Sequence, residues 1–446
     1  MRLLPTFLLS IPFCSGFLFA ANPRSPGPEG TAEEWLSYIE IEESAEDVRQ
    51  RFREKQIPTS FTELLGKRPP DSENGWMLFE KILQEFKPFL CEHNEEIRDL
   101  ASSEGIIGYP EKWITEAQNF LDNEKVDQLQ KLVQDCLVLP NWFPIRKWED
   151  GFEMIIPNIG PSRQVGQILS INYKFALLTP DAGQCSFKVA EKLVRLSRKV
   201  AQEGSLISFL AGSSIRMMPP QGAREAYAAG AVLPEPPEFD RKIWASNLNL
   251  ALNGERLIGE IGFQQTREGK DTFGGFPPPD GLAEQISHYI FRYVMIRSAH
   301  TDEDQYLKQM EMAVSNRNTE TSLTAILRTK EFHPLSINAI LLPALGTPNN
   351  RLSKLETVHT GWQLAHAIES FKKRFGHFPD SMNQLTLPAD PPLKEFRYIV
   401  KDDRSKYLLF PEDSEGFKNA LEKELSPLIW FPPGSEITEF SDQIDL

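Results

Sequence analysis

The chain has 446 residues and a formal net charge of -15 at pH 7. This length allows two or three domains and a sizeable core. Hydrophobic residues make up 40% and charged residues 25% of the sequence, as in ordinary soluble globular proteins. The acidic balance argues against a nucleic-acid-binding protein, because such a protein needs a basic face.

Residues 1–21 have the pattern of a secretory signal. A single arginine precedes an apolar run that ends in the small residues Ala20 and Ala21, and cleavage is expected after one of them. Two prolines, Pro5 and Pro12, and the short length of the run argue against a stable membrane span. We therefore expect an exported protein, periplasmic or secreted. The alternative is an uncleaved signal that anchors the chain to the membrane.

Residues 22–70 are expected to form a linker and an N-terminal helix. The linker is rich in proline and glycine. Thr31 is in a position to cap the helix, with Glu34 completing a capping box, and the helical pattern continues to Lys55. Its opposite charges at helical spacing favour a solvated surface helix over a charge-based binding role.

Residues 71–346 read as a series of helical segments with short connections, a pattern that favours antiparallel helical hairpins. The first segment places apolar side chains on one face: Trp76, Phe79, Ile82, Leu83 and Phe86. Similar segments continue to about Met218, including the run from Ser186 to Met218, and again over residues 245–263 and from Gly281 to about Met312.

Two stretches interrupt this helical pattern. Residues 219–240 and 267–281 combine proline, glycine and charge. We expect surface loops there, because such composition breaks regular structure. The alternative is a pair of mobile flaps over a groove, since long loops are often functional.

Residues 351–446 are expected to form a small α+β module. A long helix is predicted from apolar residues three or four apart: Val358, Trp362, Ala365, Ile368, Phe371 and Phe375. Gly376 fits the cap position, Pro379 prevents the helix from resuming, and a short helix ends near Leu385. Apolar residues that alternate at 396, 398 and 400, followed after a polar turn by the apolar run 407–410, predict a hairpin that packs on the long helix. Trp430 and Phe431 are expected to close this sheet.

This order of elements resembles the globular half of type II secretion pseudopilins, in which a helix lies across a small antiparallel sheet. The matching positions span the helix end and the turn after it: Ala365, Ala367, Ile368, Phe371, Gly376, Pro379, Ser381 and Leu385. A pseudopilin begins with its own membrane helix and assembles through it, whereas other sequence occupies that place here. The resemblance therefore implies the module and does not imply filament assembly.

A second resemblance covers most of residues 72–410. The stretches SENGW, PSRQVGQIL, KLVRLSRKVAQEGSLISFLAGSSI and LNGERLIGEIGF come in the same order as in a set of uncharacterised exported proteins of planctomycete and verrucomicrobial genomes. Those proteins also end in the pseudopilin-like pattern. The resemblance implies the helical architecture and brings no known activity.

Metal and cofactor sites have little support in the sequence. The seven histidines include no HExxH spacing. His359 and His366 share one face of the long helix, but a zinc site needs three or four ligands, so we expect one or both of them at the rim of the helix–sheet contact. His300, beside acidic residues 302–304, is expected in a solvated turn. No Walker loop and no GxGxxG is present, and we expect no cofactor.

The cysteines that follow the expected signal are Cys91, Cys136 and Cys185. They are far apart and form no CxxC pair, which argues against zinc. An oxidising compartment permits one disulfide and one free thiol. We favour the other interpretation, in which all three are small buried side chains in helices.

Catalytic signatures are equally scarce. No GxSxG elbow is present, and Ser213 and Ser214 lie in an apolar helical run where small residues permit close helix packing. A glycosidase needs two carboxylates across a cleft, and the sequence does not say which of its 63 acidic residues would meet. Glu255 and Arg256 are the candidate pair. Such a pair either fixes the packing of the helices, which we favour, or lines a groove.

Together these observations predict a mainly α-helical protein, an irregular array of antiparallel helical hairpins followed by the small α+β module. The expected function is a non-catalytic envelope protein that binds or scaffolds other envelope proteins, with no nucleic acid, metal or cofactor. The alternative is an exported hydrolase acting on a glycan or peptide. An enzyme should have a deep pocket with convergent polar groups, and a scaffold should have a concave face or an exposed apolar patch.

Overall fold

The computed structural model describes residues 43–102, 106, 109–154, 156, 158–179, 183–268, 299, 301–314, 346–387, 396–412, 428–435, 437 and 439–440. The chain is mainly helical, with a small two-stranded antiparallel sheet near the C-terminus, which confirms the predicted fold class. The predicted signal, the linker, the helix cap at Thr31 and most of residues 267–298 lie outside the described residues.

The first helices of the body follow the predicted order. They are α3 (Phe61–Leu65), the 3-10 helix η1 (Asp71–Glu73), α4 (Gly75–Glu92), α5 (Asn94–Ala101), α7 (Pro110–Leu121), α8 (Glu124–Val138), the 3-10 helix η2 (Trp148–Glu153) and α9 (Ile159–Leu178). Asn74 caps α4 by accepting a hydrogen bond from the backbone N–H of Trp76 at 3.2 Å. The five apolar residues predicted on one face of this helix are all buried.

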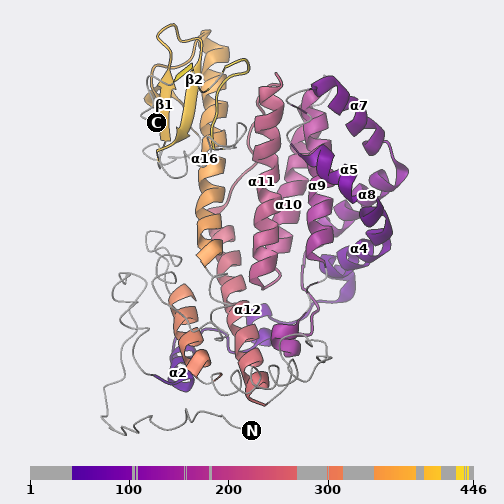
Figure 1. The fold of residues 1–446 in the computed structure, drawn as a ribbon, viewed down its shortest axis with the longest axis vertical. Coiled ribbons are helices and arrows are strands. Elements are labelled where there is room, and N and C mark those ends of the chain that lie inside the picture. The colour runs from indigo at the N-terminus through magenta and orange to yellow at the C-terminus, as the bar shows by residue number, and fades with distance from the viewer. Residues whose placement is uncertain are drawn as a thin grey trace, which may run out of the picture.

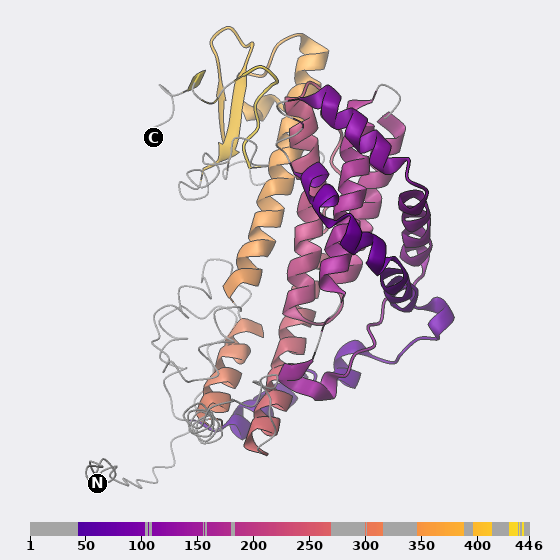
Figure 2. The ribbon, with the colours of Figure 1, turned by 45° about the vertical axis from the view of Figure 1, so that its right-hand side comes forward.

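A central layer is formed by three long helices that lie side by side: α9, α10 (Gly183–Ala201) and α11 (Leu206–Ala228). Figures 1 and 2 show α4, α5, α7 and α8 covering one side of this layer, with α12 (Arg241–Arg267) and α16 (Gly346–Phe375) on the other. Residues 186–218, expected as one run, form two helices with a turn between them. None of the described helices is long and apolar enough to cross a membrane.

Small residues bring α10 and α11 into close contact. A Cβ atom at Gly212 would lie 2.5 Å from the carbonyl oxygen of Ser197 and 2.7 Å from the Cβ of Ala201, so no larger residue fits there. Ser213 donates its hydroxyl to the carbonyl of Phe209, 2.7 Å away, within its own helix. The packing role predicted for this glycine–serine stretch is confirmed.

The C-terminal module has the predicted elements. Helix α16 ends at Phe375, and Gly376 follows with a φ of 81°, the left-handed conformation that glycine adopts without strain. The 3-10 helix η4 (Met382–Gln384) precedes strands β1 (Phe396–Val400) and β2 (Tyr407–Pro411). The strands pair in an antiparallel register from Phe396 opposite Pro411 to Val400 opposite Tyr407.

The apolar face of α16 packs on this hairpin through its middle residues, as predicted, whereas Phe375, predicted on the same buried face, is exposed. Trp362, Ala365 and Ile368 belong to one apolar core with side chains of the hairpin and the chain after it: Phe396, Tyr407, Leu409 and Trp430. Trp430 and Leu409 exchange two backbone hydrogen bonds of 2.9 Å, so Trp430 extends the sheet. The same core continues into the helical body, and α16 therefore joins the two parts of the molecule.

The loop predicted for residues 219–240 is wrong over its first part. Residues 219–228 continue α11, although Pro219 and Pro220 lie inside the helix, and both prolines are buried. Proline removes one backbone hydrogen bond and strains the preceding turn, which is why the sequence pattern indicated a break. Burial between neighbouring helices outweighs that cost here. Residues 231–240 have no regular structure.

The N-terminal helix differs from its prediction in extent and exposure. Helix α2 (Ala45–Glu54) begins after Ser44, whose backbone is extended, so it does not continue a helix from Thr31. Val48 and Phe52 are buried, and Arg49 pairs with Glu303 and Glu260. A local charge pattern cannot distinguish solvated charges from charges paired with distant segments.

The solvated acidic turn predicted at 302–304 is also wrong. These residues are helical, and Glu303 is buried between Arg49 and Arg267. Nearby, Arg51 pairs with Glu311 at 3.0 Å, and Lys55 reaches the same carboxylate at 2.9 Å. These ion pairs hold α2 against residues 301–314, and Figure 1 shows the two segments near each other at the lower end of the molecule.

The cysteine prediction holds for one of two described thiols. Cys136 is buried, as expected, and burial raises its pKa to about 12. Cys91 is exposed on α4, contrary to the prediction, because it lies on the solvent side of that amphipathic helix. Both are free thiols. The side chain of Cys185 lies outside the described residues.

Candidate functional site

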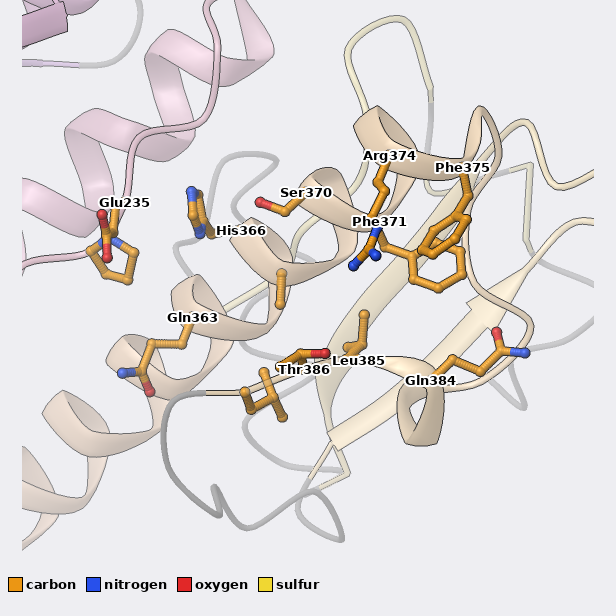
Figure 3. Close-up of a pocket in the computed structure, with 13 residues that line it drawn as sticks. Glu235, Gln363, His366, Ser370, Phe371, Arg374, Phe375, Gln384, Leu385 and Thr386 are labelled. Carbon is orange, nitrogen blue, oxygen red and sulfur yellow. The ribbon is translucent and has the colours of Figure 1, made fainter.

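An open groove lies along the C-terminal half of α16, with a volume of about 550 Å³. One wall is α16, a second is the extended chain after η4, and residues 235–236 close one end (Figure 3). Its lining mixes apolar and polar side chains: Glu235, Pro236, Gln363, His366, Ala367, Ser370, Phe371, Arg374, Phe375, Gln384, Leu385, Thr386 and Leu387.

The sequence builds this groove from the second face of α16. The first face, with Trp362 and Ile368, is buried against the body and the hairpin. Residues 363, 366, 367, 370 and 374 recur at helical spacing on the opposite side. Gly376 and Pro379 then reverse the chain, so that residues 385–387 run back beside the helix that precedes them.

The two ends of the groove carry different charges. Glu235 and His366 lie at the end near the helical body, and Arg374 and Phe375 lie at the end near the hairpin (Figure 3). Burial lowers the pKa of His366, and the neighbouring Glu235 carboxylate opposes that shift. Phe375 is 51% exposed, an unusual position for so large an apolar side chain. The groove therefore runs from an acidic end to a basic end, and the exposed side chain of Phe375 lies beside the basic end.

The polar groups of the groove do not form a hydrogen-bonded catalytic set. Ser370 lies one turn after His366 on α16, and in the described part of the chain no hydrogen bond joins the two. Within the same residues, no group of three or more histidine, cysteine, aspartate or glutamate side chains is placed to hold a metal ion.

Glu255 and Arg256, predicted as a pair, contact different partners. Arg256 is buried, pairs with Glu260, donates to the carbonyl of Pro58 and lies over the ring of Phe52. Glu255 is half-buried beside the turn before α11, and burial raises its pKa. Neither side chain lines the groove, and both fix the packing of α12.

The two histidines predicted on one face of α16 have separate surroundings. His359 is buried, stacks on Phe239 and accepts a hydrogen bond of 3.4 Å from Arg216. Its pKa falls to about 3, first because burial disfavours the charged imidazolium and second because the Arg216 guanidinium is near. His359 is therefore neutral at pH 7, and only His366 belongs to the groove.

Sequence reasoning missed the charged side chains buried on α11. Arg216 and Arg224 are fully buried, and Glu225 pairs with the buried Lys174 at 2.7 Å. Arg224 donates to the carbonyl of Ile429 at 2.8 Å and lies 4.2 Å from the ring centroid of Phe431. Arg216 and Arg224 connect α11 to α16 and to the C-terminal module, whereas Glu225 joins α11 to α9. The expectation of a loop at 219–240 concealed Arg224 and Glu225.

Comparisons with known proteins leave the site to be interpreted from its own geometry. No protein-family model, no curated protein and no solved structure matches this chain.

Proposed function

We propose that this protein is an exported, non-catalytic binding protein that holds a segment of another protein in the groove along α16. The observation that carries the proposal is the apolar surface of Phe371, Phe375 and Leu385, with Phe375 51% exposed, in a groove that has oppositely charged ends. Exposed apolar surface of this kind typically marks a binding site. Export to the envelope rests on the signal-like pattern of residues 1–21.

The position of the groove adds support. It lies where the helical body meets the C-terminal module, and binding sites are often found between such parts. The resemblance of residues 351–410 to pseudopilin heads agrees with a role in protein contacts. A short segment buries little area, so we expect an affinity on the order of micromolar.

The experiment selects binders from a phage-displayed library of random heptapeptides on the immobilised full chain. We expect enriched peptides that bind the wild-type protein and bind the Phe375→Ala variant roughly fivefold more weakly, because about 1 kcal/mol of apolar burial is lost. Phe187→Ala is the matched control, since Phe187 is also exposed on a helix, at 45%, and does not line the groove.

Two outcomes would refute the proposal. One is a selection that enriches no peptide above the bare support, and the other is equal binding to both phenylalanine variants. Mass spectrometry of the eluted peptides separates binding from the alternative function. Intact peptides agree with a binding protein, whereas cleaved peptides would assign the groove to a hydrolase.

A further inference from the structure

We infer that the groove takes an extended peptide, which pairs with the backbone of residues 385–387 and places a carboxylate against Arg374. This inference rests on the proposed function and specifies its ligand. It combines three independent features of the groove: unpaired backbone N–H groups directly after the extended residue Leu385, the length of the α16 face, and the distribution of charge along it.

The first feature is the backbone after η4. Leu385 has extended dihedral angles, a φ of -80° and a ψ of 142°, and its N–H already donates to the carbonyl of Met382 at 3.1 Å. In the described part of the chain, the N–H groups of Thr386 and Leu387 have no hydrogen-bond partner. Free backbone groups in an extended segment are the template to which another strand adds.

The second feature is length. From Gln363 to Arg374 the helix face that lines the groove rises about 16 Å, at 1.5 Å per residue. An extended peptide rises about 3.3 Å per residue, so roughly five residues fill the groove from end to end. Alternate side chains of such a peptide point to the same side. Two or three of them would therefore meet the apolar surface formed by Phe371 and Leu385.

The third feature is charge. Arg374 is exposed at the hairpin end of the groove, and among the described residues it forms no ion pair with a carboxylate. Its guanidinium lies 5.2 Å from the ring centroid of Phe375, which holds the cation beside the apolar surface. Glu235 lies at the opposite end. A peptide with alternating apolar residues and an acidic residue at the hairpin end complements this arrangement.

The test uses synthetic peptides taken from the selection on the full chain. We expect them to contain an aspartate or glutamate whose replacement by lysine weakens binding roughly fivefold. The Arg374→Glu variant should bind the acidic peptide roughly fivefold more weakly than the wild type does. It should bind the lysine peptide roughly fivefold more tightly than the wild type does. Lys373→Glu is the matched control, because this neighbouring exposed cation does not line the groove.

A second arm tests the backbone pairing. Methylation of alternate peptide nitrogens removes the N–H groups that would donate to the backbone carbonyls of residues 385–387, which accept no backbone hydrogen bond in the described part of the chain. It should weaken binding roughly tenfold at the residues that face 385–387, because each lost hydrogen bond costs about 1 kcal/mol and the methyl group blocks approach. Binding that depends on Phe375 but is indifferent to both charge reversal and N-methylation would overturn this inference and leave the proposed function in place. A library that contains no binder would overturn both.

Discussion

Two ends of the same molecule are held together by different physical means. At the upper end, α16 meets the hairpin through buried aromatic and aliphatic side chains such as Trp362 and Tyr407. At the lower end, α2 meets residues 301–314 through buried ion pairs, among them Arg51 with Glu311 and Arg49 with Glu303. The sequence predicted the first contact and not the second.

The difference shows which interactions can be predicted from residues that are close together in the sequence. An apolar stripe is visible because its residues recur at the period of one helix. An ion pair between Arg49 and Glu303 joins residues 254 positions apart, and neither residue indicates its partner. Charged residues are usually solvated, so the charge pattern of α2 favoured a surface helix until the fold supplied the partners.

The largest effect is expected at the apolar contact. Trp362→Ala should lower the free energy of unfolding by about 4 kcal/mol, because the side chain is fully buried and its indole N–H donates to the carbonyl of Pro234 at 3.0 Å. Urea unfolding of the full chain measures this loss. The matched variant Phe375→Ala, on the same helix and half-exposed, should change stability by less than about 0.5 kcal/mol. Similar losses for both variants would contradict the packing of α16 on the hairpin.

A somewhat smaller loss is expected at the ionic contact. Glu311→Gln should cost about 3 kcal/mol, because Glu311 is fully buried and its removal takes a carboxylate from Arg51 and Lys55. Glu54→Gln makes the same chemical change on the exposed side of α2 and should cost almost nothing. If the two variants unfold at the same urea concentration, the ion pairs do not hold α2 in place.

The next largest effect is expected from His359 in the middle of α16, which should make the free energy of unfolding depend on pH. The folded pKa of His359, about 3, lies below its ordinary value of 6.5, so the unfolded chain binds the proton more readily between these values. Stability contributed by the neutral histidine is therefore present above pH 6.5 and is lost as the pH falls. By pH 5 the loss should reach about 2 kcal/mol relative to pH 7.

The variant His359→Gln separates this loss from other titrations. Burial raises the pKa of Glu203 and Glu255, which changes stability in the opposite direction, but these groups are common to both proteins and cancel in the comparison. The fall in the free energy of unfolding from pH 7 to pH 5 should be about 2 kcal/mol smaller in the variant than in the wild type. An equal difference in both proteins would mean that His359 is not held neutral by burial.

The smallest change in stability is expected where a serine precedes a helix, and two such positions can be compared, one at each end of the molecule. The hydroxyl of Ser44 accepts a hydrogen bond of 3.3 Å from the backbone N–H of Asp47 at the start of α2, so Ser44→Ala should cost about 1 kcal/mol. Ser381 precedes η4 and makes no side-chain cap, so Ser381→Ala should be nearly neutral. Thermal unfolding resolves the two, and the reverse order would contradict the capping geometry.

The sequence by itself determined the helical class, the order of most helices, and the helix, glycine cap and hairpin of the C-terminal module. These features depend on periodicity, capping and turn chemistry, which act over a few neighbouring residues. The tertiary structure alone decided that Pro219 and Pro220 lie inside a helix, that Glu303 is buried, and that His366 and Arg374 share a groove with Leu385. The first two depend on contacts between segments far apart in the chain, and the free energy of such contacts outweighs local preference. The groove depends on the path by which residues 376–387 return beside α16.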